Sequence, residues 1–246
     1  MARRPRERGD SFLSGLQQKL DKFLDSEIDI GSFPGAVYVI GDSSEVVVES
    51  ARGHAVIIPA KIPVSVETIY DVASLTKPLI TATIALLSAA EGKIDLNDAL
   101  SMHVPELGAT DKKDVTFIDL LTHRGGFQAW YPLYTQGLGK PAYFEALLKR
   151  PLRYRPGTRE IYSCLGFILL MTALERVYGA PIEDLANEKI FAPLGLSRSL
   201  FSPPPEMKYV IAATEWGNSN ERQMVAARSL TFPRFRNYMI CGEVDD

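Results

Sequence analysis

The sequence has few of the residues that build the commoner functional sites. It contains only two cysteines, Cys164 and Cys241, which are too few for a disulfide framework and lack metal-ligand spacing. The three histidines, His54, His103 and His123, are widely separated and form no metal-ligand pattern either. There is also no Gly-x-Ser-x-Gly segment, which argues against an α/β-hydrolase. We therefore expect no metal ion and no cofactor.

The chain also has little net charge and no long apolar run. The net formal charge is −3, which argues against a nucleic-acid partner. Four arginines between residues 3 and 8 form the only basic cluster, and we expect residues 1–10 to be a disordered tail. No run of about 18 apolar residues suggests a membrane span. No apolar segment follows the basic N-terminus as in a secretory signal, so the chain as given predicts a cytoplasmic protein, with a periplasmic or secreted location left open.

Hydrophobic periodicity predicts one helix and one hairpin at the start of the chain. Apolar residues recur at helical spacing between residues 11 and 25. Two Val-rich segments, 36–40 and 46–50, flank a turn and predict an antiparallel hairpin. Residues 53–63 read as a loop with short extended pieces. A lone two-stranded hairpin is marginally stable in water, and the pattern after residue 207 predicts no further strand.

The middle of the chain, from about residue 80 to residue 200, is predicted to be mainly helical. Thr116 and Asp119 stand at capping-box spacing and predict a helix start. We expect this helix to end at Gly125, with His123 and Arg124 in its last turn, where positive charge suits the helix dipole. The other expected helices cover residues 74–91, 143–149, 166–178 and 181–191.

The segment 71–77, Asp-Val-Ala-Ser-Leu-Thr-Lys, holds the most informative pair of residues. Ser74 and Lys77 stand three apart at a helix start, so they share one helical face. Pro78 is tolerated only in the first turn, which places Ser74 at the very start. An amine beside a hydroxyl can take its proton as the hydroxyl attacks a carbonyl. Taken alone, the spacing favours the simpler interpretation of Ser74 as a helix cap and Lys77 as a solvated side chain.

A second candidate is Tyr162, which follows a Pro-Gly turn and precedes an apolar helix. A tyrosine beside an ammonium group can hold or relay a proton. Taken alone, a tyrosine in this position is more often a core or interface residue.

Together these segments resemble the serine β-lactamase and penicillin-binding-protein superfamily, in its β-lactamase-related esterase branch, similar to class C enzymes. They occur in the family's order from about residue 30 to residue 200. The matching segments are 33–36 (Phe-Pro-Gly-Ala), 70–77, 120–126 (Leu-Leu-Thr-His-Arg-Gly-Gly), 154–157, 162–163 with 166–167, and 191–196.

This resemblance implies an α/β (α+β) fold, with a β-lactamase/transpeptidase-like mixed sheet, flanking helices and an all-α region. It implies a serine hydrolase that cleaves a small-molecule ester or amide through an acyl-enzyme on Ser74. Lys77 would be neutral or share a proton, and Tyr162 would be the partner base. The backbone N–H of Ser74 would be one oxyanion donor.

Two departures from the family pattern qualify these expectations. Cys164 stands where the second motif, Tyr-x-Asn, usually has the asparagine. At this substrate-binding position a thiol favours ester cleavage over β-lactam or peptide turnover. No Lys-Thr-Gly or His-x-Gly triplet follows Tyr162, so we expect one incomplete domain over residues 11–246 with its C-terminal strands missing. The alternatives are a catalytically silent binding module of the same fold and self-association through an exposed sheet edge.

Overall fold

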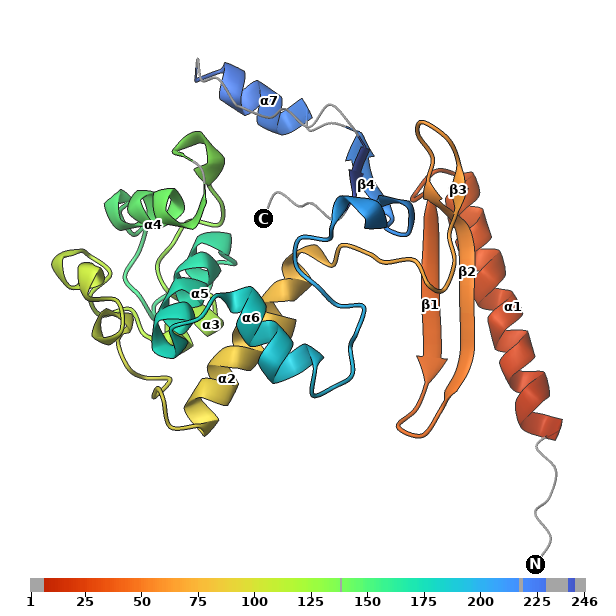
Figure 1. The fold of residues 1–246 in the computed structure, drawn as a ribbon, viewed down its shortest axis with the longest axis horizontal. Helices are drawn as coiled ribbons and strands as arrows, with labels where there is room; N and C mark the ends of the chain where they lie inside the picture. Colours follow the sequence, from red (N-terminus) through yellow and green to blue (C-terminus); the bar gives the residue numbers. More distant parts are fainter. Residues whose placement is uncertain (1–6, 138, 217–218, 229–238, 242–246) are drawn as a thin grey trace, which may run out of the picture. The chain divides into compact units, whose positions relative to one another are not determined.

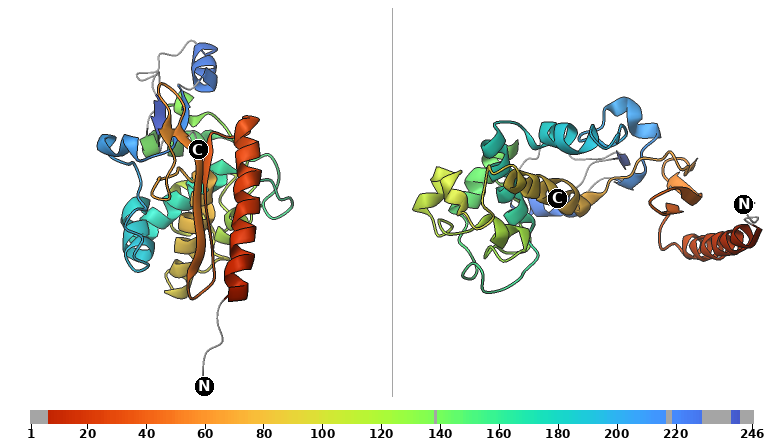
Figure 2. Two further views of the ribbon diagram at one scale, coloured as in Figure 1. Left: turned by 90° about the vertical axis from the view of Figure 1, so that its right-hand side faces the viewer. Right: turned by 90° about the horizontal axis from the view of Figure 1, so that it is seen from below.

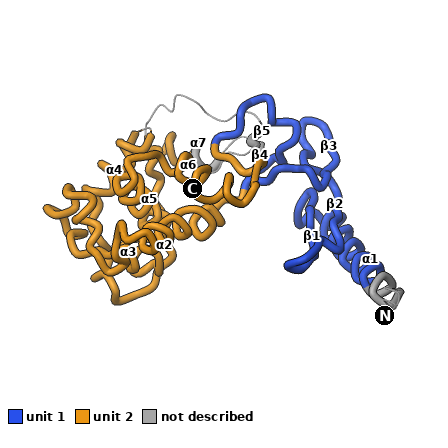
Figure 3. Tube along the Cα trace, turned by 60° about the horizontal axis from the view of Figure 1, so that its bottom comes forward, with its two compact units in different colours: residues 1–71, 202–218, 234–244 blue, residues 72–201, 219–233, 245–246 orange. Residues whose placement is uncertain are grey.

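The structure of the chain is a computed structural model that describes residues 7–137, 139–216, 219–228 and 239–241. Its contacts divide the chain into two compact units (Figure 3). The first comprises residues 1–71, 202–218 and 234–244, and the second comprises residues 72–201, 219–233 and 245–246. The single domain expected over residues 11–246 stays a prediction.

The first unit contains a long helix and an antiparallel sheet (Figure 1). The elements are α1 (Glu7–Asp29), β1 (Gly35–Gly41), β2 (Val46–Val56) and β3 (Ile62–Pro63), and the sheet order is β1-β2-β3. The hairpin and the helix are confirmed, and the extended pieces expected between residues 53 and 63 are the end of β2 and β3. Helix α1 begins at Glu7, while residues 1–6 of the expected tail lie outside the described residues, so the disordered tail stays a prediction.

Helix α1 is held on the hairpin by polar contacts from two aspartates. Asp21 Oδ1 accepts hydrogen bonds from the Tyr38 hydroxyl at 2.9 Å and from Ser50 Oγ at 2.8 Å. Asp25 forms a two-pronged ion pair with Arg52, whose Nε lies 2.8 Å from Asp25 Oδ1. Both partner strands therefore bind the same face of α1, which runs along the sheet in the left view of Figure 2.

Two further strands belong to this unit, and the sequence pattern did not predict them. β4 (Ala213–Trp216) and β5 (Met239–Cys241) form an antiparallel pair. They follow the short 3₁₀ helix η7 (Pro205–Tyr209), and Ile211 forms a parallel bridge with Ile69. The expectation of no strand after residue 207 is therefore wrong, because the two partners are too far apart in sequence for a turn signal to mark them.

The second unit is helical, as expected. Thr116 accepts the N–H of Asp119 at 3.2 Å and Asp119 accepts the N–H of Thr116, so the predicted capping box is confirmed. The helical elements are η1 (Ala73–Leu75), η2 (Lys77–Ala82), α2 (Thr83–Ala90), η3 (Leu100–Met102), η4 (Pro105–Ala109), α3 (Phe117–Leu121), η5 (Leu133–Thr135), α4 (Gly139–Lys149), α5 (Cys164–Tyr178), α6 (Ile182–Ala186), η6 (Asn187–Phe191) and α7 (Ser219–Ala226).

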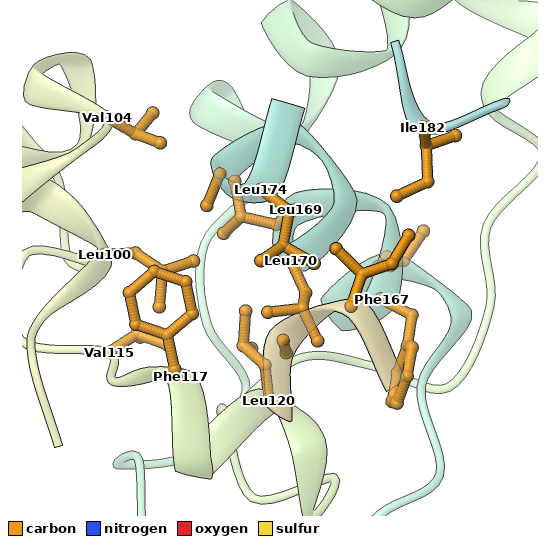
Figure 4. Packing of buried hydrophobic residues seen from close by; sticks show 14 of the residues in the cluster. Leu100, Val104, Val115, Phe117, Leu120, Phe167, Leu169, Leu170, Leu174 and Ile182 are labelled. Atoms are coloured by element: carbon orange, nitrogen blue, oxygen red, sulfur yellow. The ribbon is translucent and has the colours of Figure 1, made fainter. Parts of the chain in front are cut away.

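The core of this unit is built around α5 (Figure 4). Leu169, Leu170 and Leu174 of α5 are completely buried, and Phe117 and Leu120 of α3 pack into the same cluster. Full burial of one such side chain stabilises the fold by roughly 1.5–3 kcal/mol. The core therefore fixes the position of α3 relative to α5, and both helices carry residues next to the site described below.

Among the residues that the structure describes, the helical stretch Ala73–Ala90 is long and apolar enough to cross a membrane. The helices Cys164–Tyr178 and Ile182–Phe191 reach the same length and apolarity only when the bent pair is counted as one span. The expectation that no stretch reaches this length is therefore wrong for Ala73–Ala90. Its residues Ile80 and Ile84 are buried in the core of the second unit. Core helices of globular proteins also reach this length and apolarity.

Candidate active site

Ser74 lies on a short 3₁₀ turn that begins with an unusual backbone conformation. Ala73, the first residue of η1, has φ of 45°. A positive φ is disfavoured for any residue with a Cβ, and such strain is retained only where the surrounding structure enforces it. Strained residues of this kind cluster at functional sites. The positive φ of Ala73 therefore indicates a functional site next to Ser74.

Lys77 is brought against Ser74 by this local geometry. Ser74 lies on the 3₁₀ turn and Lys77 is the first residue of the helix that follows it, so the two side chains stand three residues apart on one helical face. Lys77 Nζ donates a hydrogen bond to Ser74 Oγ at 2.9 Å, and the lysine is only 9% exposed. The shared face predicted from the spacing is confirmed. A buried amine in contact with a hydroxyl is the arrangement that activates a serine.

The chain does not continue from Ser74 as one α-helix. The π-helix η2 (Lys77–Ala82) separates the 3₁₀ turn from α2, with Pro78 in its first turn as predicted. Proline has no N–H to donate, so a break in the hydrogen-bond ladder is least costly here. Single π-turns within helices are frequent at functional sites.

Tyr162 approaches the same region from an anchored loop. The N–H of Ile161 donates to the carbonyl of His123 at 2.9 Å. On the other side of the tyrosine, Ser163 Oγ donates to the carbonyl of Gln128 at 2.7 Å. The backbone is thus held before and after Tyr162, while its side chain remains 49% exposed.

Ser74, Lys77 and Tyr162 line one pocket, so the structure brings together the three residues predicted to be catalytic. Its volume is about 550 Å³, within the range of small-molecule sites. Lys77 Nζ lies 5.5 Å from the centroid of the Tyr162 ring. Apolar side chains, including Leu121 and Phe167, form part of the wall. The pocket therefore combines an apolar wall with a few converging polar groups.

His123 also lines this pocket, and sequence reasoning misplaced it. It does not lie in the last turn of α3, which ends at Leu121, and its φ is 57°. Its ring centroid lies 4.6 Å from that of Tyr162. Burial lowers the pKa of His123 below 6.5, and the charge of Lys77 acts in the same direction, while Glu160 opposes both. The imidazole is therefore neutral at pH 7.

Cys164, predicted to bind substrate, is the first residue of α5 and is 8% exposed. It is not among the described residues that line the pocket, so its substrate role stays a prediction. Within the described ranges, no group of three or more histidine, cysteine or acidic side chains is placed to hold a metal ion.

A serine–lysine pair at the start of an apolar helix lines one pocket with a tyrosine, in a protein that combines a small antiparallel sheet with a helical unit. The family model Beta-lactamase matches residues 17–233. The chain belongs to the beta-lactamase family, which confirms the resemblance drawn from the motifs.

Known proteins of similar sequence and structure agree with this assignment. The chain is 30% identical to a putative D-alanyl-D-alanine carboxypeptidase of Escherichia coli (strain K12), over 93% of this chain and 56% of that protein. The chain therefore spans little more than half the length of this relative. A class C beta-lactamase has a TM-score of 0.74 at 22% identity, over 84% of this chain and 56% of its own. The octameric penicillin-binding protein homologue from Pyrococcus abyssi has a TM-score of 0.69 at 24% identity. This match covers 83% of this chain and 48% of the homologue. These likenesses confirm the predicted fold.

Proposed function

We propose that the chain carries the site of a serine hydrolase that cleaves ester or amide bonds through an acyl-enzyme on Ser74. The observation that carries the proposal is the 2.9 Å hydrogen bond from the buried Lys77 Nζ to Ser74 Oγ, inside a pocket of about 550 Å³. Membership of the beta-lactamase family and the likeness to a putative carboxypeptidase support it.

In the acylation step, Ser74 Oγ attacks the substrate carbonyl and its proton passes to Lys77 Nζ in the neutral form. The new Oγ–C bond leaves a negative oxygen, which the N–H of Ser74 stabilises as one oxyanion donor. The bond to the leaving oxygen or nitrogen then breaks, and this atom takes the proton from the ammonium. Tyr162, on the Lys77 side of the same pocket, completes the proton path.

In the deacylation step, water attacks the acyl carbon and its proton passes to the Tyr162–Lys77 pair. The Oγ–C bond breaks and Ser74 Oγ recovers a proton, so the enzyme returns to its starting state. Each step moves one proton over a short path, which is the general acid–base contribution expected of such a pair.

The pocket suits a small acyl group. Leu121 and Phe167 supply an apolar wall against which an acyl chain can pack. Ester substrates are favoured over peptides, because Cys164 offers only a weak hydrogen-bonding thiol next to the tyrosine motif. The substrate class is therefore short-chain esters, with small amides as slower substrates.

The proposal is tested by hydrolysis of p-nitrophenyl acetate. The wild-type chain should show a burst and steady turnover, and Ser74→Ala should reduce both to the background rate. Ser197→Ala, an exposed serine far along the chain, is the matched control and should behave like wild type. Equal rates for wild type and Ser74→Ala would refute the proposal and favour the catalytically silent binding module.

A further inference from the structure

The end of helix α3 has the hydrogen bonds of a Schellman motif. The N–H of Arg124 donates to the carbonyl of Asp119 at 2.6 Å, and the N–H of His123 donates to the carbonyl of Leu120 at 3.1 Å. His123 occupies the position after the C-cap, with φ of 57° in the left-handed region. This position is usually glycine, because a Cβ is disfavoured there.

Other helix ends in the same unit use glycine in this conformation. Gly92, after α2, has φ of 70°, and Gly179, which caps α5, has φ of 68°. A histidine is better tolerated at positive φ than most residues, but it still costs conformational energy that glycine would not. The helix end requires the left-handed conformation but not a histidine, so the presence of histidine where glycine would be less strained points to a role for the side chain.

The side chain and backbone of His123 hold both neighbours of Tyr162. His123 Nδ1 accepts the N–H of Ser163 at 3.1 Å, and the His123 carbonyl accepts the N–H of Ile161 at 2.9 Å. The imidazole ring also contacts the rings of Tyr162 and Phe167, at centroid distances of 4.6 and 4.9 Å. One residue thus contacts the tyrosine ring and both flanking peptide groups.

We propose that His123 is the positioning residue for Tyr162, held in a left-handed conformation so that its imidazole anchors the Ile161–Ser163 segment and packs against the tyrosine ring. This inference rests on the proposed function, in which Tyr162 completes the proton path of Ser74 and Lys77. Its contribution is to keep the phenol within reach of Lys77 while half of the tyrosine side chain remains exposed.

The anchor requires a neutral imidazole, because Nδ1 can accept the Ser163 N–H only when it carries no proton. The charged and titratable groups near it are Lys77 from η2 and Glu160 and Tyr162 from the loop, while α5 contributes the uncharged Phe167. Burial and Lys77 lower the pKa of His123 below 6.5, so the anchor is fully present above pH 6.5 and is lost as the pH falls through the lowered pKa.

Two substitutions separate positioning from folding. His123→Gly removes the imidazole with its hydrogen bond and ring contacts but relieves the positive φ, so these effects offset and the melting temperature should change little while kcat for p-nitrophenyl acetate falls about 10- to 100-fold. His123→Asn tolerates the left-handed conformation and offers an amide oxygen to the Ser163 N–H, so it should recover part of that loss. In wild type, kcat should fall at acid pH as His123 becomes protonated. In His123→Gly, this part of the dependence of kcat on pH should disappear.

The matched control is Gly179→His, which places a histidine at another helix end with φ of 68° and no atom within 4 Å of its Cβ. It should lower the melting temperature and leave kcat unchanged. Unchanged kcat in His123→Gly would overturn the proposal, and so would a parallel loss of stability and activity in both His123 variants.

Hydrogen exchange keeps the test independent of activity. The Ser163 amide should exchange at least tenfold faster in His123→Gly than in wild type, and at a near wild-type rate in His123→Asn. Equal exchange in all three chains would overturn the positioning role. If the exchange behaves as expected while wild type and Ser74→Ala hydrolyse the ester equally slowly, the proposed function fails and the anchor stands.

Discussion

Replacing Lys77 by methionine separates the catalytic role of the amine from its structural role. The side chain is 9% exposed, donates to Ser74 Oγ at 2.9 Å and lies 5.5 Å from the centroid of the Tyr162 ring. Methionine keeps a similar unbranched chain and removes the amine. The substitution therefore deletes the proton acceptor while leaving the apolar packing largely in place.

The effect on stability follows from three opposing contributions. The lost hydrogen bond is worth about 1 kcal/mol. The lost contact with the Tyr162 ring is worth about 0.5–1 kcal/mol. Against these, burying an ammonium group costs several kcal/mol, which methionine avoids. We expect Lys77→Met to be as stable as wild type or more stable by about 1–2 kcal/mol, a rise of several degrees in melting temperature.

The effect on activity should be in the opposite direction. Loss of a general base reduces the rate by about 10²–10⁴-fold, or roughly 3–5 kcal/mol in the activation barrier. Thermal unfolding and the burst rate with p-nitrophenyl acetate measure the two effects on one preparation. Lys113→Met, at an exposed lysine, is the control and should change neither. A Lys77→Met chain within tenfold of the wild-type rate would refute the assignment of Lys77 as the base.

Three further substitutions test the fold around the site. Thr116→Ala leaves the N–H of Asp119 without its capping partner and should cost about 1 kcal/mol in chemical unfolding. Leu170→Ala opens a cavity at a fully buried position of α5 and should cost about 2–5 kcal/mol in the same assay. Hydrogen bonds from Arg176 lower the pKa of Glu106 from 4.5 to about 2, so this pair stabilises the native state above pH 4.5 and the contribution is lost as the pH falls to about 2. Glu106→Gln should flatten that acid limb in thermal unfolding, and high salt should weaken the effect because both side chains are partly exposed.

The features that local sequence could predict are those in which the interacting residues are close along the chain. The capping box joins Thr116 to Asp119, and the hairpin joins segments separated by a short turn. The pair β4 and β5 escaped prediction, because Trp216 and Met239 pair across a long intervening segment. Nothing in a window of either strand specifies such a partner.

The same distinction applies to the site. Ser74 and Lys77 are three residues apart, so their spacing predicted a shared helical face, and the structure adds the contact between them. Tyr162 joins them only through the tertiary fold, and the family resemblance supplied that link. His123 was missed because its role depends on contacts with residues far along the chain. The available signal was a histidine where a helix end usually has glycine, two residues before Gly125.

The most direct test of the account is covalent labelling of the nucleophile. A fluorophosphonate probe is incubated with the wild-type chain, and intact mass and peptide mapping locate the adduct. The account predicts one adduct, on Ser74, that forms more slowly in Lys77→Met and is absent in Ser74→Ala. An unlabelled wild-type chain, or an adduct on another residue, would contradict the claim that Ser74 and Lys77 form an activated nucleophile.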